Sequence, residues 1–226
     1  MKLILLIFIG WFLTSFSQVQ DWANLNRFKN ENQKLADPTD GENRVVFMGN
    51  SITDSWARFD SSFFSGKPYI NRGISGQTTP QMLIRFRADV VDLKSAVVVI
   101  LAGTNDIAGN TGPSTNKMIF DNIKSMAEVA TANKIKVVLC SVLPVLDYPW
   151  KPGLNPSEKI IKLNKMIKDY SYENGLVYLD YFQSMVNDQN GLKDELTYDG
   201  VHPNKAGYKV MAPLAEAAIT KALNQN

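Results

Sequence analysis

The sequence predicts an α/β fold: a three-layer α/β/α sandwich in which a five-stranded parallel sheet lies between two layers of helices. Two observations predict it. Residues 96–101 are apolar without alternation, which is typical of a strand covered on both faces, and residues 135–142 are predicted to be another buried strand. Five such short runs alternate along the chain with segments whose apolar residues recur at helical spacing. The chain has 226 residues and no linker-like tract, so we expect a single domain.

The predicted strands cover, in chain order, residues 44–48, 69–72, 96–101, 135–142 and 176–180. Parallel strands joined through helices require crossover connections, and these are right-handed in nearly all proteins. A flavodoxin-like strand order, 2-1-3-4-5, makes the second, first and third strands neighbours. We therefore expect the segments that follow these three strands to meet at one edge of the sheet.

The predicted helices lie between and around these strands. An amphipathic helix over 21–35 would place its apolar residues on one face and pack on the outside of the domain; these residues are Trp22, Leu25, Phe28 and Leu35. Further helices are predicted from Ile52 to Phe59, over 80–91, 116–133 and 156–170, and from Asn204 onward. Pro213 lies inside the last of these and predicts a kink or a restart there.

The N-terminus has the pattern of a secretory signal peptide. Lys2 precedes an apolar run over 3–13 that is too short to span a bilayer, and small residues, Ser15 and Ser17, precede Gln18. We expect a signal peptide over 1–17, one domain over 18–226, and no stable membrane insertion after cleavage. An uncleaved anchor is the alternative. The sequence thus predicts a secreted or periplasmic protein.

Composition argues against a nucleic-acid partner and against an internal disulfide. The 24 basic and 22 acidic residues are spread along the chain without a basic run, so nucleic acid is not an expected partner. The single cysteine, Cys140, lies in an apolar run and excludes an internal disulfide; a buried, inert thiol is expected. The sequence leaves the oligomeric state open.

Polar residues and glycines gather where the predicted strands end. Ser51 follows the first strand at a strand–turn–helix junction, Gly73 follows the second and Asn105 the third, and residues 199–203 follow the last strand by a loop. A serine at such a junction lies beside unpaired backbone N–H groups, which favour developing negative charge. Ser51 is therefore a candidate nucleophile, with a plain helix N-cap as the alternative.

Each remaining role in ester hydrolysis has a candidate. His202 is the only histidine and would take the proton of Ser51 through Nε2. Asp199 lies three residues earlier and would accept the Nδ1 proton. The N–H groups of Ser51 and Gly73 and the side-chain amide of Asn105 would bind the oxyanion. Each residue alone would more often be a turn or a cap, but their coincidence at strand ends favours a catalytic site.

Four blocks of the chain resemble those of the SGNH or GDSL-type hydrolases, in the same order: residues 49–53, Gly73, residues 103–106 and residues 199–203. The resemblance covers the whole mature chain. It implies serine-dependent ester hydrolysis by Ser51, His202 and Asp199, without a metal or a cofactor. Asn50 stands where the family usually has Asp, so we expect an altered rate or pH dependence rather than lost chemistry.

The loop over 143–156 is the longest at this edge, and its Tyr148 and Trp150 could form an aromatic wall for substrate, with Asn50 as a further candidate. No long apolar lid segment is evident. We expect small acyl groups, acetyl above all, on a polar and possibly carbohydrate alcohol. The alternatives are a lysophospholipase or thioesterase of the same family and a non-catalytic carbohydrate-binding domain. A nucleotide binder is disfavoured because the chain has no Gly-rich phosphate loop.

Overall fold

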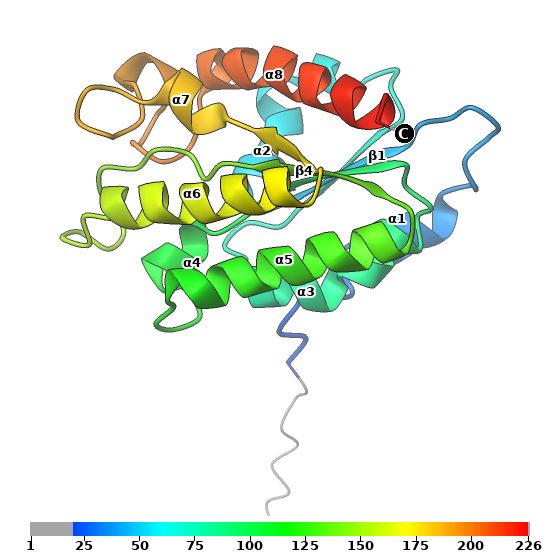
Figure 1. The fold of residues 1–226 in the computed structure, drawn as a ribbon, viewed down its shortest axis with the longest axis horizontal. Helices are drawn as coiled ribbons and strands as arrows, with labels where there is room; N and C mark the ends of the chain where they lie inside the picture. Colours follow the sequence, from blue (N-terminus) through cyan, green and yellow to red (C-terminus); the bar gives the residue numbers. More distant parts are fainter. Residues whose placement is uncertain (1–19, 226) are drawn as a thin grey trace, which may run out of the picture.

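The computed structural model describes residues 20–225 and has one parallel sheet of five strands in the order β2-β1-β3-β4-β5 (Figure 1). The predicted fold class and strand order are confirmed. The strands are β1 (Val45–Gly49), β2 (Tyr69–Gly73), β3 (Val97–Leu101), β4 (Lys136–Cys140) and β5 (Val177–Leu179). The predicted signal peptide, residues 1–17, lies outside the described residues.

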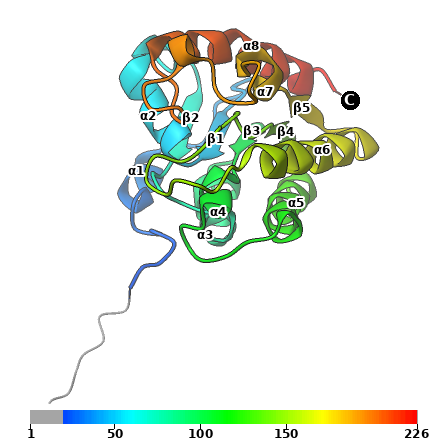
Figure 2. The ribbon, with the colours of Figure 1, turned by 90° about the vertical axis from the view of Figure 1, so that its left-hand side faces the viewer.

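Helices cover both faces of the sheet (Figure 2). One layer contains α2 (Ser51–Phe59), α7 (Tyr181–Met185) and α8 (Lys205–Leu223); the other contains α3 (Thr79–Phe86), α5 (Asn116–Ala132) and α6 (Ser157–Glu173). The short elements are α1 (Lys29–Lys34), α4 (Thr104–Ala108), the 3₁₀ turns η1 (Ser61–Phe63) and η3 (Asp194–Leu196), and the π-helical turn η2 (Arg87–Val91). Among residues 20–225, no helix combines the length and apolar character that a membrane span requires.

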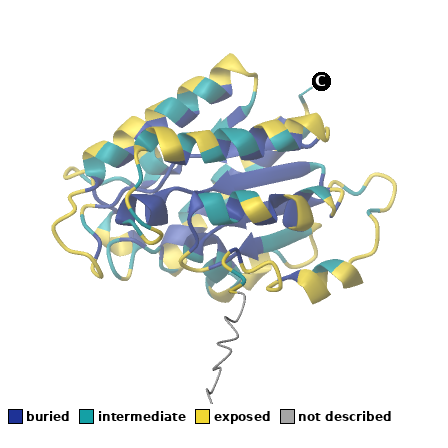
Figure 3. Cartoon of the chain, turned by 90° about the horizontal axis from the view of Figure 1, so that it is seen from below, coloured by how far each residue is buried: buried dark blue, intermediate teal, exposed yellow. Residues whose placement is uncertain are grey.

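The strand period of two divides the core into halves. In β1, Val46 and Met48 pack with the apolar faces of α3, α5 and α6. Val45 and Phe47 point the other way and pack with α2 and α8. Every residue of β1 and β3 is buried, as a sheet covered on both faces requires. Figure 3 shows this layering: the central strands are buried, the edge strand β2 is partly buried, and the exposed positions lie on the outer helix faces and loops.

The three neighbouring strands end level with one another. Gly49 pairs with Gly73 on one side and with Leu101 on the other. The chain therefore leaves β1, β2 and β3 at the same height, and the segments that follow them share the carboxyl edge of the sheet. This is the edge at which open parallel sheets bind their ligands.

The predicted helix over 21–35 is wrong in its first half, where residues 20–28 form turns and only α1 is helical. The Asp21 carboxylate accepts hydrogen bonds from the N–H groups of Leu25 and Asn26, and Asn24 has a φ of 54°. These local bonds compete with helix formation. At the other end of the chain, α8 runs through Pro213 as one helix and does not restart.

Candidate active site

The turn after β1 places Ser51 at the first position of α2. The preceding residue, Asn50, caps the helix: its Oδ1 accepts from Ile52 N at 3.1 Å. Gly49 has to be glycine because a Cβ there would lie 2.0 Å from Thr53 Oγ1. Among the described residues, no acceptor is bonded to the Ser51 N–H. The turn therefore presents a hydroxyl and a free backbone donor from the same residue.

The structure brings Ser51, His202 and Asp199 together from distant parts of the chain. Ser51 Oγ lies 2.9 Å from His202 Nε2, and His202 Nδ1 lies 2.7 Å from Asp199 Oδ2. These distances are those of hydrogen bonds. A hydroxyl, an imidazole and a carboxylate in this order can move a proton from the hydroxyl to the ring while the carboxylate holds the ring in one orientation.

Backbone contacts fix the loop that carries the histidine. Asp199 Oδ1 accepts from His202 N at 2.7 Å and from Val201 N at 3.0 Å. Thr197 Oγ1 donates to the His202 carbonyl oxygen at 2.7 Å. Burial alone would raise the pKa of Asp199, but the hydrogen bonds from His202 and Val201 outweigh it and hold the pKa below its usual value. The carboxylate thus stays ionised at any neutral or mildly acidic pH.

Gly73 does not present a free N–H, in contrast to the sequence prediction. Its N–H donates to Asn71 Oδ1 at 2.9 Å, and a Cβ at this position would lie 2.1 Å from Asp54 N. The glycine is required because α2 passes directly over the end of β2. Its role in this structure is close packing, and the predicted oxyanion donor has to be sought elsewhere.

Gly76 has the feature that Gly73 lacks, a backbone N–H available to a ligand. It lies in an exposed turn with a φ of 79°, and no acceptor in residues 20–225 is bonded to its N–H. Its carbonyl accepts from Asn110 Nδ2 at 3.1 Å, which fixes the peptide. The neighbouring Ser75 lines the same cavity as Ser51. The sequence carries a signal for this turn in the polar stretch over 75–79, which contains Gly76.

Asn105 is buried on α4, directly after β3. Its Nδ2 donates to the Gln77 carbonyl oxygen at 2.9 Å, which ties it to the turn that carries Gly76. An amide nitrogen carries two hydrogens, so one remains for a ligand. The next residue, Asp106, accepts from Thr79 N at 3.0 Å and from Thr79 Oγ1 at 2.5 Å. Burial raises the pKa of Asp106 to about 6 against the opposing effect of these bonds.

Two of the three predicted substrate-binding residues are buried. Asn50 is 1% exposed and Tyr148 is 0% exposed, so neither offers a side-chain surface to substrate. Tyr148 instead donates from its hydroxyl to the Thr104 carbonyl oxygen at 2.9 Å. Its ring lies 5.2 Å from that of Trp150, which is 46% exposed and 5.9 Å from the His202 ring. Tyr148 therefore supports Trp150 from behind, and Trp150 remains beside the site as predicted.

A cavity of about 450 Å³ lies over the hydroxyl of Ser51. Its lining is mostly polar and consists of Ser51, Asp54, Ser55, Arg58, Ser75, Tyr198 and His202. The Tyr198 ring stacks on the His202 ring at 5.7 Å and an interplanar angle of 10°. Sequence reasoning identified Ser51 and His202 but missed the other five residues of this lining. The sequence contains a signal for two groups of them. Asp54, Ser55 and Arg58 follow Ser51 at helical spacing, and Tyr198 directly precedes Asp199.

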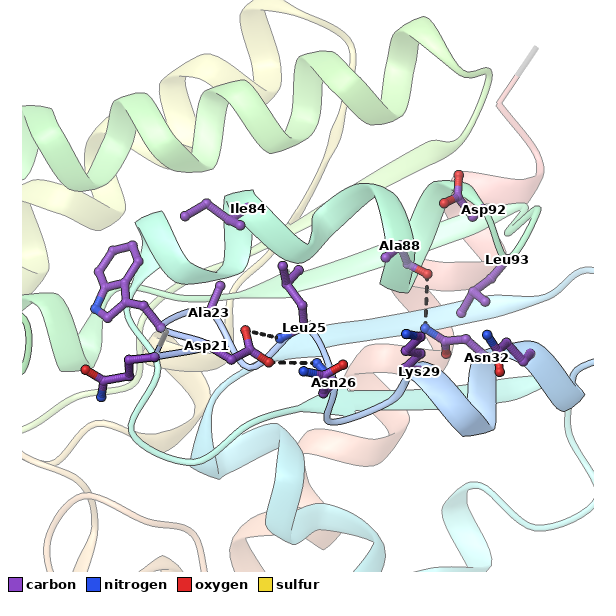
Figure 4. Close-up of a pocket in the computed structure, with 13 residues that line it drawn as sticks. Asp21, Ala23, Leu25, Asn26, Lys29, Asn32, Ile84, Ala88, Asp92 and Leu93 are labelled. Atoms are coloured by element: carbon purple, nitrogen blue, oxygen red, sulfur yellow. Dashed lines mark hydrogen bonds between the residues drawn. The ribbon is translucent and has the colours of Figure 1, made fainter. Parts of the chain in front are cut away.

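A larger cavity of about 940 Å³ lies elsewhere, between the N-terminal segment and the α3–η2 region (Figure 4). Trp22, Leu25 and Ile84 line it, and none of Ser51, His202 and Asp199 does. Its lining within residues 20–225 contains no serine, threonine or cysteine next to a histidine, so size alone does not mark the reactive site. Among residues 20–225, no cluster of His, Cys, Asp and Glu is arranged to hold a metal ion.

Comparison with known proteins points to one family. A sequence profile of the GDSL-like lipase/acylhydrolase family matches residues 47–210, which include every residue of the hydrogen-bonded series described above. An acetylxylan esterase of Xylanibacter ruminicola is 27% identical over 92% of this chain. The alignment covers 48% of that esterase, so the chain spans about half the length of this curated relative.

Two solved structures from Bacteroides resemble the whole domain. A proposed acylhydrolase of Bacteroides fragilis is 47% identical, with a TM-score of 0.89 over 91% of this chain and 100% of the other. A GDSL-like lipase of Bacteroides thetaiotaomicron is 49% identical, with a TM-score of 0.86 over 88% and 98% of the two chains. Both likenesses extend over most of this chain.

Proposed function

Because the chain belongs to the GDSL-like lipase/acylhydrolase family, whose members hydrolyse esters, we propose that it is a serine esterase with Ser51 as its nucleophile. The observation that carries the proposal is the unbroken hydrogen-bonded series from Ser51 Oγ through the His202 ring to the Asp199 carboxylate. His202 is the only histidine in the chain, so no second imidazole competes for the role of base. The Asp199 carboxylate stabilises the imidazolium that forms.

The reaction proceeds in two steps. Ser51 Oγ attacks the ester carbonyl carbon as its proton passes to His202 Nε2, and the tetrahedral intermediate collapses when the imidazolium gives that proton to the leaving alcohol. The acyl group is then bonded to Ser51 Oγ. Water attacks this acyl-enzyme by the same route, with His202 as base, and releases the carboxylic acid and the free serine.

The oxyanion is bound by the N–H groups of Ser51 and Gly76 and the side-chain amide of Asn105. Gly76 replaces Gly73 in this proposal because the Gly73 N–H already donates to Asn71 Oδ1, whereas the Gly76 N–H has no acceptor among residues 20–225. Preorganised donors of this kind act on charge that develops only in the transition state. They therefore raise the rate of reaction more than the affinity for substrate.

The substrate is a small acyl ester, with acetyl favoured, of a polar and preferably carbohydrate alcohol. Three observations support this. The cavity over Ser51 is lined mostly by polar groups, including the side chains of Asp54, Ser75 and Arg58. Trp150 offers an exposed aromatic face beside His202, suited to a sugar ring. A relative that covers most of this chain is an acetylxylan esterase.

Substrate choice is tested with p-nitrophenyl esters of acetate, butyrate and octanoate, followed by acetate release from acetylated xylan. The acetyl ester should give the highest kcat/KM, and Ser51→Ala should abolish turnover of every ester while the protein keeps its melting temperature. A preference for the octanoyl ester would instead favour a lipase or thioesterase. Binding of xylan without turnover of any ester would favour a non-catalytic carbohydrate-binding domain.

We also propose export from the cytoplasm, supported by the signal-peptide pattern of residues 1–17. Expression of the full chain in a bacterial host followed by N-terminal sequencing of the mature protein tests this. We expect Gln18 as the first residue, in the medium or the periplasm. A mature protein that begins at Met1 and remains in the cytoplasm would contradict the proposal.

A further inference from the structure

A buried arginine lies directly beneath the candidate site. Arg85, on α3, is 0% exposed and makes three separate hydrogen bonds. Its Nε donates to Gln77 Oε1 at 2.6 Å, Nη1 to Asp89 Oδ2 at 2.9 Å and Nη2 to the Gly49 carbonyl oxygen at 3.1 Å. The guanidinium fork thus joins three segments of the chain from one planar group.

Two of these three partners lie in the segments that supply the oxyanion donors. Gly49 is two residues before Ser51, at the turn that presents the Ser51 N–H. Gln77 directly follows Gly76, and its carbonyl oxygen accepts from Asn105 Nδ2 at 2.9 Å. A single guanidinium therefore connects the turn of the first donor with the turn and the amide of the other two. Among residues 20–225, Arg85 makes no hydrogen bond to Ser51, Gly76 or Asn105.

The charge of Arg85 is balanced within the network. Asp89 lies one turn later on the same helical stretch and forms a buried ion pair with it. The second oxygen of Asp89 accepts from Asn32 Nδ2 at 2.7 Å. A buried pair of this kind gives little net stability compared with apolar packing, but it is geometrically strict, because breaking either partner leaves an uncompensated charge. Such a group is suited to fixing positions.

The N-terminal segment covers this network on the outside. Gln77 Nε2 donates to the Ala23 carbonyl oxygen at 2.8 Å, and Gln81 Nε2 donates to the Trp22 carbonyl oxygen at 2.6 Å. Figure 4 shows the segment with Ala23 beside the helical stretch that carries Ile84 and Ala88. Gln77 Oε1 accepts from Arg85 and Gln77 Nε2 donates to Ala23, so only one orientation of the side-chain amide satisfies both hydrogen bonds.

We propose that Arg85 is a positioning residue that sets the spacing of the oxyanion donors by holding the Gly49 and Gln77 turns together. The inference rests on the proposed esterase function and adds a residue outside the reacting groups. Since the donors act on the transition state, a change in their spacing affects kcat and leaves KM nearly unaltered. A purely structural residue would lower the melting temperature without this kinetic signature.

The test compares Arg85→Met and Arg85→Lys with a matched control, Arg44→Met. Arg44 is also buried and also donates to two backbone carbonyl oxygens, those of Ala36 and Leu93, but it lies at the opposite edge of the sheet. With p-nitrophenyl acetate, Arg85→Met should lower kcat roughly 10- to 100-fold with KM within about threefold. Arg85→Lys should restore part of the loss, and Arg44→Met should keep kcat within about twofold.

Active-site labelling of the wild-type protein separates this proposal from the proposed function. If a fluorophosphonate does not modify wild-type Ser51, the esterase proposal itself fails. If the wild type is labelled and either folded Arg85 variant keeps the wild-type kcat, the positioning role is wrong. A kcat loss of equal size in Arg44→Met would also overturn it. Should Arg85→Met fail to fold, Arg85→Lys keeps the charge and loses the fork, and it carries the test alone.

Discussion

Each edge of the sheet has a buried arginine that donates hydrogen bonds to backbone carbonyl oxygens, but the two arginines have different roles. At the amino edge, Arg44 precedes β1 and donates to the carbonyl oxygens of Ala36 and Leu93, which lie in structural loops. At the carboxyl edge, Arg85 donates to the Gly49 carbonyl oxygen beside Ser51. A buried arginine that gathers carbonyl groups thus stabilises one edge and, by our inference, arranges the donors of a reactive site at the other.

The two edges differ most in whether their backbone N–H groups have hydrogen-bond acceptors. At the amino edge, backbone groups bond to one another: Val45 N donates to the Pro68 carbonyl oxygen at 2.8 Å, and Lys136 N to that of Ala96 at 2.9 Å. At the carboxyl edge, the N–H groups of Ser51 and Gly76 have no acceptor within residues 20–225. Unpaired donors next to a nucleophile are costly for stability and useful for binding an anion.

The largest expected effect comes from the base at the carboxyl edge. His202→Asn should lower kcat/KM for p-nitrophenyl acetate by about three to four orders of magnitude, because no other imidazole can take the Ser51 proton. The His202 ring is partly exposed, so the melting temperature should change little. Turnover within tenfold of wild type would show that His202 is not the base. The carboxyl edge would then lack the catalytic role that distinguishes it from the amino edge.

Loss of one oxyanion donor should have the next largest effect. Asn105→Ala removes the side-chain amide and should lower kcat by roughly 10²- to 10³-fold with little change in KM, as expected for a group that acts in the transition state. Steady-state kinetics on the acetyl ester measure the split. A rise in KM at constant kcat would show that Asn105 binds the ground state and that the carboxyl edge holds substrate rather than the oxyanion.

Trp150 should affect binding more than chemistry. Trp150→Ala removes an exposed aromatic face beside His202 and should raise KM for an acetylated xylo-oligosaccharide about tenfold, with a smaller effect on p-nitrophenyl acetate. Tyr148→Phe is the control, since it deletes a buried hydroxyl bonded to Thr104 and leaves the Trp150 face in place. An equal loss on both substrates would assign Trp150 a packing role only.

The expected effect of Asp106 is on stability rather than on turnover. Its folded pKa of about 6 lies above the usual value for an aspartate, so the folded state binds the proton more tightly than the unfolded state. The stability from this group is complete below about pH 4 and is lost as the pH rises through about 6, a difference of about 3 kcal/mol.

Urea unfolding of wild type and Asp106→Asn between pH 4 and pH 7.5 measures this difference. The advantage of the wild type over the variant should shrink as the pH rises through about 6. A pH-independent difference would mean that the bonds from Thr79 keep the carboxylate ionised throughout, and the carboxyl edge would then hold a buried charge rather than a buried acid.

The features that the sequence predicted correctly are those that depend on hydrophobic periodicity and on which residues follow each strand. Buried runs and helical spacing are sufficient for the five strands and the helices between them, and a flavodoxin-like strand order then brings Ser51 and Asn105 to one edge. The choice between Gly73 and Gly76 depends on the position of the Asn71 side chain, which no local pattern encodes. The same is true of the loop aromatics, where Tyr148 turns inward to Thr104 and Trp150 turns outward.

Local competition and burial account for the remaining differences. The segment over 21–28 has a helical apolar spacing, yet the Asp21 carboxylate binds the N–H groups that a helix would use. Arg85 has helical spacing to Met82 and Asp89 and shares their inward face. A charged residue is read from sequence as solvent-exposed unless its partner is known, and here the partners lie on β1, in the Gly76 turn and on η2.

The central claim is that Ser51 is an activated nucleophile, and covalent labelling tests it most directly. Wild-type protein and Ser51→Ala are treated with a fluorophosphonate, and the modified peptide is identified by mass spectrometry. The account predicts one adduct per wild-type chain, on Ser51, and none on the variant. An unmodified wild-type Ser51, under conditions in which a known serine esterase reacts fully, would contradict it.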